Sequence, residues 1–110
     1  MSRTIITNSG SEFFTNINSE QLIGELCKMV NAKFFMYKTY FTEDIKMAFS
    51  MTEEETIDAC EKLKTLYERV DEIFPDLSDF FEKGSTSVDL KEFLDYIIEC
   101  LITSKGYECI

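Results

Sequence analysis

The sequence has no histidine among its 110 residues. Histidine is the usual general base and a common metal ligand, so its absence excludes Ser–His and Cys–His nucleophiles and the Glu-x-x-His motifs of di-iron helix bundles. The glycines are scattered, and no glycine-rich phosphate loop precedes a helix. We therefore expect a protein that is not an enzyme, with no catalytic residue, no cofactor and no metal ligand.

Residues that break helices are also rare, with one proline and four glycines, whereas 45% of the residues are hydrophobic and 14% are aromatic. A chain of this length can fold around one core without a disulfide or a metal. We predict an all-α fold, a small single-domain helical bundle of three main helices plus two short ones. An irregular N-terminal arm at residues 1–18, either flexible or a small hairpin, should precede the helical domain at 19–110.

No run approaches the roughly 20 apolar residues that cross a bilayer, and no leader-like segment begins the chain. The cysteines Cys27, Cys60, Cys100 and Cys109 form no CxxC pair. We expect a reduced, cytoplasmic protein with no membrane partner. Phe, Tyr, Met, Ile, Asn and Lys total 44 residues against 10 for Gly, Ala, Arg and Pro, which suggests an AT-rich genome such as that of many phages and bacteria.

Apolar spacing places the first two helices. The first should begin after Ser19, which is a good N-cap, and should run to about Phe41. A short helix at residues 42–50 should follow. The first helix becomes apolar nearly all round toward its end, so we predict that this segment is either central in the bundle or half of an apolar interface formed by Phe35, Met36 and Tyr40.

The third helix has the clearest start in the sequence. Thr52 and Glu55 fit a capping box, in which each side chain accepts a hydrogen bond from the backbone of the other residue. The inner stripe of this helix is expected to include Ile57. The helix should end at Phe74, because Pro75 disfavours a helical conformation at the residue before it.

Two further helices are expected in the last third of the chain. Asp76 should cap a short helix that stops at Gly84. The last helix should span residues 88–104, with Gly106 as its natural end.

The segment Ser87-Val88-Asp89-Leu90-Lys91-Glu92-Phe93 resembles the exit of an EF-hand calcium loop. Glu92 would hold the last loop position, Val88 the apolar eighth position, and Phe93 would begin the exit helix. The first, third, fifth and sixth positions depart from the family pattern, because they hold Phe81, Lys83, Ser85 and Thr86. The resemblance implies a degenerate EF-hand-like helical module that has lost most of its calcium ligands.

The charge is distributed unevenly along the chain. Residues 1–50 hold five basic and five acidic side chains, whereas residues 51–110 hold six basic and sixteen acidic ones. The whole net charge of −10 therefore belongs to the second half. We predict an acidic face that binds the partner. It consists of Glu54, Asp58, Glu61, Glu68 and Glu72, with Glu92, Asp95 and Glu99 either extending it or standing apart.

This acidic face has two interpretations. It could simply keep a small protein soluble, or it could steer the protein to a basic partner. Direct contact with nucleic acid is disfavoured, because like charges repel and no basic stripe is present. A magnesium site at Glu92, Asp95 and Glu99 is less well supported than a solvated helix face.

Our leading hypothesis is a small acidic interaction protein, an inhibitor, antidote or adaptor that binds a basic surface of another protein. A phage-encoded or bacterial protein that blocks a nucleic-acid-binding enzyme would fit this description. The alternatives are a structural subunit or homo-oligomer, including a homodimer, of a larger assembly, and the EF-hand-like module.

Overall fold

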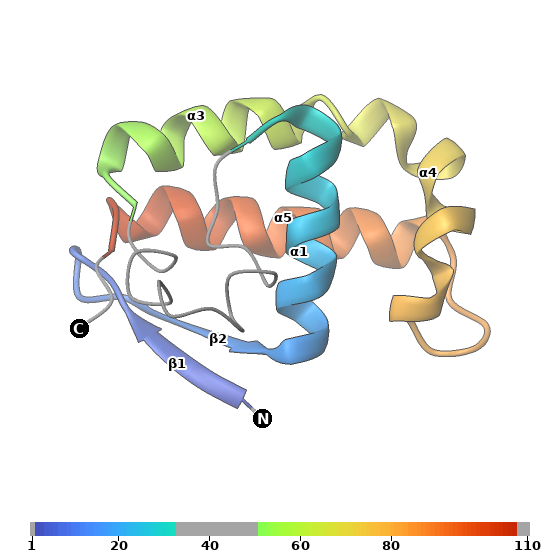
Figure 1. Ribbon diagram of the computed structural model, residues 1–110, viewed down its shortest axis with the longest axis horizontal. Coiled ribbons are helices and arrows are strands. Elements are labelled where there is room, and N and C mark those ends of the chain that lie inside the picture. Colours follow the sequence, from blue (N-terminus) through green and yellow to red (C-terminus); the bar gives the residue numbers. More distant parts are fainter. Residues whose placement is uncertain (1, 33–50, 108–110) are drawn as a thin grey trace.

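The computed structural model describes residues 2–32 and 51–107, and this part of the chain is mostly helical (Figure 1). The elements in chain order are β1 (Ser2–Ile6), β2 (Glu12–Asn16), α1 (Ile17–Val30), α3 (Glu53–Lys64), η2 (Tyr67–Arg69), α4 (Val70–Leu77), η3 (Ser78–Phe80) and α5 (Ser87–Ser104), where η marks a 3₁₀ helix. None of these helices is long and apolar enough to span a bilayer. The predicted helix at 42–50, the predicted end of the first helix, and the interface candidates Phe35, Met36 and Tyr40 lie outside the described residues.

Helices α3 and α5 lie side by side and run in opposite directions (Figure 1). Helix α1 crosses in front of them, while the hairpin and α4 lie toward opposite ends of the pair. The core fills the space where these helices meet. Its buried side chains are Leu22, Ile23, Leu26, Cys27, Met51, Ala59, Cys60, Leu63, Leu66, Ile73, Leu77, Leu90, Leu94, Ile97, Ile98, Leu101 and Tyr107.

Of the two forms predicted for the N-terminal arm, the structure has the β-hairpin, so the chain is mostly helical and the all-α description is correct only in its coarser form. Strands β1 and β2 pair antiparallel, and the turn between them contains Gly10 at a φ of 86°. The start of the first helix was also predicted too late. Asn16 is the N-cap, and Ser19 is the third helical residue, whose hydroxyl accepts a hydrogen bond from the Asn16 N–H at 2.9 Å.

The third helix is interrupted rather than continuous to Phe74. Helix α3 ends at Lys64, where the Thr65 hydroxyl bonds the Lys62 carbonyl at 2.6 Å and competes with the helical pattern. After η2, α4 continues through Pro75 to Leu77, so the predicted stop before Pro75 is wrong. Pro75 has no N–H to donate to the Asp71 carbonyl four residues earlier. Both residues are exposed, so water can hydrate this carbonyl.

The predicted cap at Asp76 is likewise wrong, because this residue lies inside α4. The last helix agrees closely with its prediction. Helix α5 begins at Ser87 with Thr86 as N-cap and ends at Ser104. Lys105 and Gly106 follow at φ values of 56° and 94°, which is the left-handed exit that a glycine near a helix C-terminus predicts.

The C-terminal end of α5 is joined to two distant parts of the chain through a cluster that we call the C-terminal tie: residues 7–9, Met51 and residues 104–107. Tyr107 and Met51 exchange two backbone hydrogen bonds of 2.9 Å each. The Asn8 N–H donates to the Gly106 carbonyl at 2.8 Å. These bonds fasten the start of α3 and the turn of the hairpin to the end of α5.

The opposite end of the helix pair, which we call the loop end, consists of residues 81–87 with Tyr67, Asp71 and Asp95. It is held by side chains. The Ser87 hydroxyl bonds the Asp71 carboxylate, and the Tyr67 hydroxyl donates to Asp95 Oδ1 at 2.5 Å. The loop end therefore connects the η2–α4 segment to the first half of α5.

Candidate protein-interaction surface

All eight predicted acidic side chains are exposed. Their elements differ: α3 carries Glu54, Asp58 and Glu61, η2 and α4 carry Glu68 and Glu72, and α5 carries Glu92, Asp95 and Glu99. On both long helices they lie opposite the buried stripe. We call the α3 set the α3 row and the α5 set the α5 row.

The packing of α3 against α5 places the two rows on neighbouring helices. The Cys60 thiol is 3.5 Å from the Ile98 carbonyl and marks the contact between the helices, which we call the α3–α5 seam. The Tyr67–Asp95 hydrogen bond joins the middle of the α5 row to η2. The α5 row therefore lies alongside the α3 row and extends the acidic surface.

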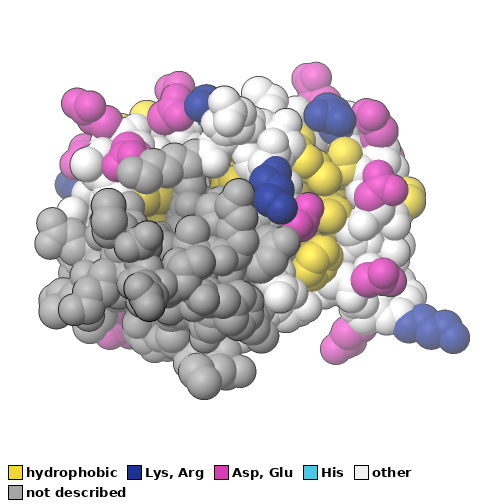
Figure 2. All heavy atoms as spheres, viewed as in Figure 1, with side chains coloured by type: hydrophobic (Ala, Val, Ile, Leu, Met, Phe, Trp, Pro, Cys, Tyr) yellow, Lys and Arg dark blue, Asp and Glu magenta, His cyan; other side chains and the backbone are white. Residues whose placement is uncertain are grey.

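Basic side chains interrupt this surface. Lys62 Nζ lies 3.0 Å from Asp58 Oδ2, and Arg69 Nε lies 3.4 Å from Glu72 Oε2. Figure 2 shows Asp and Glu side chains along the edge where α3 lies and down the side of α4, with Lys and Arg between them. Exposed pairs of this kind contribute little stability, but they reduce the local negative potential at Asp58 and Glu72.

Two exposed isoleucines between the rows were missed by sequence reasoning. Ile57, predicted to face inward, is 46% exposed, and Ile102 is 49% exposed. Cys60 follows Ile57 by three residues and contacts Ile98, which precedes Ile102 by four. Because the helices are antiparallel, one turn back along α3 corresponds to one turn forward along α5, so both isoleucines lie at the same level of the seam.

The residues that resemble the exit of an EF-hand loop form the start of α5. The Thr86 N–H donates to Asp89 Oδ2 at 2.7 Å, and Thr86 Oγ1 accepts from the Val88 N–H at 3.3 Å. These bonds form a capping box for α5. Within residues 2–32 and 51–107, no three His, Cys, Asp or Glu side chains group closely enough to hold a metal ion.

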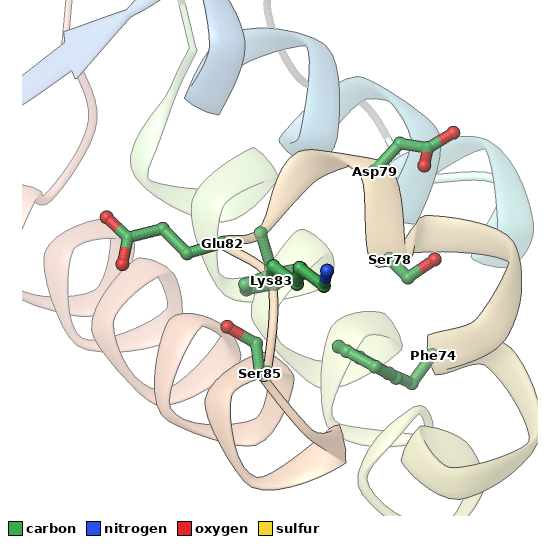
Figure 3. Close-up of a pocket in the computed structure, with 8 residues that line it drawn as sticks. Phe74, Ser78, Asp79, Glu82, Lys83 and Ser85 are labelled. Carbon is green, nitrogen blue, oxygen red and sulfur yellow. The ribbon is translucent and has the colours of Figure 1, made fainter.

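A hollow of about 380 Å³ lies beside the loop end (Figure 3). Phe74 and Phe81 line it, with ring centroids 5.5 Å apart, and Lys83 extends across it. The carboxylates of Asp79 and Glu82 point away from it. Its polar groups do not converge on one point, so it lacks the arrangement that fixes a small ligand.

The described cysteines have no features of reactive thiols. Cys27, Cys60 and Cys100 are free, and the first two are buried in the core. Burial raises the pKa of Cys27 to about 12 and that of Cys60 to about 11. Both thiols are therefore protonated at neutral pH and pack as small apolar groups.

Comparison with family models, with curated proteins and with solved structures gave no significant match.

Proposed function

We propose that this protein is a small acidic interaction protein that binds a basic surface of another protein, as an inhibitor, antidote or adaptor. The observation that carries the proposal is the exposure of all eight carboxylates, six of which lie on the two helices that form the α3–α5 seam. The first 50 residues contribute no net charge, whereas the last 60 contribute −10. Such a one-sided field accelerates association with a basic partner and disfavours acidic ones.

The partner class follows from the charge. A protein cleft that binds nucleic acid is basic, and an acidic surface can occupy it by charge complementarity. The block of a phage or bacterial nucleic-acid-binding enzyme is one activity of this kind. An acidic surface without a basic stripe would repel nucleic acid itself.

The test is affinity capture from the source cell with the immobilised protein, at about 50 mM and about 500 mM salt, where screening lengths differ by about threefold. We expect a basic partner that is retained at low salt and released at high salt. Glu54→Lys/Asp58→Lys/Glu61→Lys and Glu92→Lys/Asp95→Lys/Glu99→Lys should each lower its retention.

Asp76→Lys/Asp79→Lys/Glu82→Lys is the matched control, because it changes the charge equally at exposed positions away from the α3–α5 seam. Retention should fall less in this control than in the row variants. Equal effects from all three variants would indicate general charge instead of a surface. Salt-independent capture would contradict the proposal, and light scattering of a stable homodimer would favour the subunit alternative.

A further inference from the structure

The α3–α5 seam carries an apolar strip bordered by carboxylates on both sides. Ile57 and Ile102 form the strip, each about half exposed at one level of the seam. Glu54 and Glu61 lie three residues before and four after Ile57, so they share its side of α3. Glu99 lies three residues before Ile102, and Asp95 lies one turn further.

Basic residues limit the strip at its two ends. Lys64 lies two turns along α3 from Ile57, and Lys105 lies three residues after Ile102. Cys60 and Ile98, which form the floor between the two helices, are buried. The strip therefore offers an apolar centre, acidic flanks and a length of about three helical turns.

We infer that this seam binds an amphipathic helix whose apolar residues contact Ile57 and Ile102 and whose Lys or Arg residues pair with the flanking carboxylates. The inference rests on the proposed function and specifies that the basic surface of the partner is an amphipathic helix. A helix laid in an apolar groove presents residues at i, i+3, i+4 and i+7, and its flanking positions then face the groove's borders. Carboxylates at those borders select basic flanks.

A second copy of this chain is a poorer occupant of the same strip. If two copies paired through their isoleucines, the carboxylates that border each strip would face one another. Like charges across an interface cost free energy and disfavour the complex. Charge complementarity therefore assigns the strip to a basic helix.

The experiment uses two fluorescent peptides of about 15 Leu and Lys residues each, a length at which isolated helices begin to form. One has Leu at helical spacing on one face, and the other is a scramble of the same composition. Binding to the full chain is measured by fluorescence anisotropy. We expect the patterned peptide to bind about tenfold more tightly than the scramble, because only it can bury the two isoleucines.

The decisive variant is Ile57→Gln/Ile102→Gln, which should remove the preference for the patterned peptide. Its thermal unfolding shows whether the fold is retained. The matched control is Val88→Gln, because Val88 is 61% exposed on α5 and lies in its first turn, away from the strip. This control should keep the preference.

The outcomes separate the inference from the proposed function. Equal affinity of the native chain for both peptides, or an unchanged preference in the isoleucine variant, overturns the inference. If charge reversal of either carboxylate row still weakens the binding of both peptides, the acidic-surface proposal stands even though the inference fails. If reversal of the rows has no effect, the proposed function fails. A native dimer that dissociates in the isoleucine variant shows that a second copy occupies the strip, which also overturns the inference.

Discussion

The two ends of the α3–α5 pair are fastened by different means. At the C-terminal tie, backbone hydrogen bonds join three chain segments around Gly106. At the loop end, side-chain hydroxyls bond exposed carboxylates, and Gly84 has no atom within 4 Å of where a Cβ would lie. Ile57 and Ile102 lie nearer the tie. We therefore expect the tightly packed tie to keep Ile57 and Ile102 at the same level of the seam. The conformation of the loop end should be less constrained.

The largest expected effect is at Gly106. A Cβ there would lie 2.8 Å from the Met51 carbonyl oxygen and 2.9 Å from the Glu53 nitrogen, at a φ of 94°. Strain and overpacking together should lower the free energy of unfolding of Gly106→Ala by about 3 kcal/mol in urea titrations.

The matched control for this substitution is Gly84→Ala. Gly84 has a similar φ of 95° in open space, so it should show the backbone strain alone, about 1 kcal/mol. Equal losses in the two variants would show that the tie is not closely packed. Gly106→Ala should also weaken binding of the patterned peptide, whereas Gly84→Ala should not.

A smaller effect is expected at Ser104, which is fully buried in the tie. Its hydroxyl donates to the Leu101 carbonyl at 2.7 Å and accepts from the Gly106 N–H at 3.1 Å. Ser104→Ala leaves a buried N–H without its partner and should cost about 2 kcal/mol in the same urea titration.

Ser78 provides the control for Ser104, because its hydroxyl also bonds the carbonyl three residues earlier, but at an exposed site. Ser78→Ala should cost at most about 0.5 kcal/mol. A comparable loss in both serine variants would argue that burial at the tie contributes nothing special.

The N-terminal caps of α3 and α5 allow a direct comparison of the two ends, because Thr52 follows Met51 of the tie and Thr86 belongs to the loop end. Thr52→Ala and Thr86→Ala each remove a capping box and should cost about 1 kcal/mol. Hydrogen exchange should distinguish them. Loss of the Thr86 cap should speed exchange in the first turn of α5 while the amides of the tie stay protected, because the ends open separately. Faster exchange at both ends in Thr86→Ala would show that the pair opens as one unit.

These caps also show what could be predicted from the sequence. The capping box at Thr52 and the exit at Gly106 depend on residues within a few positions, so local chemistry is enough to locate them. The box at Asn16 was missed, because its reciprocal residue is Ser19 instead of the usual Glu or Gln. Apolar spacing placed α5 within one residue of its bounds, although its capping box at Thr86 was missed.

The features that could not be predicted from the sequence depend on tertiary packing. The break between α3 and α4 could not be read from periodicity, because the buried Leu66 and Ile73 are seven residues apart and would share one face of an unbroken helix as well. Ile57 follows the inner stripe by spacing, yet it lies at the outer edge of a seam between two helices. The acidic residues could be named from the sequence, but whether the α5 row extends the α3 row depended on how the two helices pack.

The smallest expected effect concerns Tyr67, whose hydroxyl bonds Asp95 at the loop end. At neutral pH, Tyr67→Phe should cost at most about 0.5 kcal/mol, because the bond is exposed and water competes for both groups.

Alkaline pH should enlarge the difference in stability between the native protein and Tyr67→Phe. Burial, and next the Asp95 carboxylate, raise the pKa of Tyr67 above its ordinary value of 10.0. The unfolded chain therefore loses this proton first, and the native protein loses stability as the pH rises above about 10. Tyr67→Phe should lack that part of the decline in urea titrations across this range. Asp95→Asn, which keeps an acceptor but removes the charge, should show an intermediate decline. Identical pH profiles for all three proteins would show that this hydrogen bond does not hold the loop end.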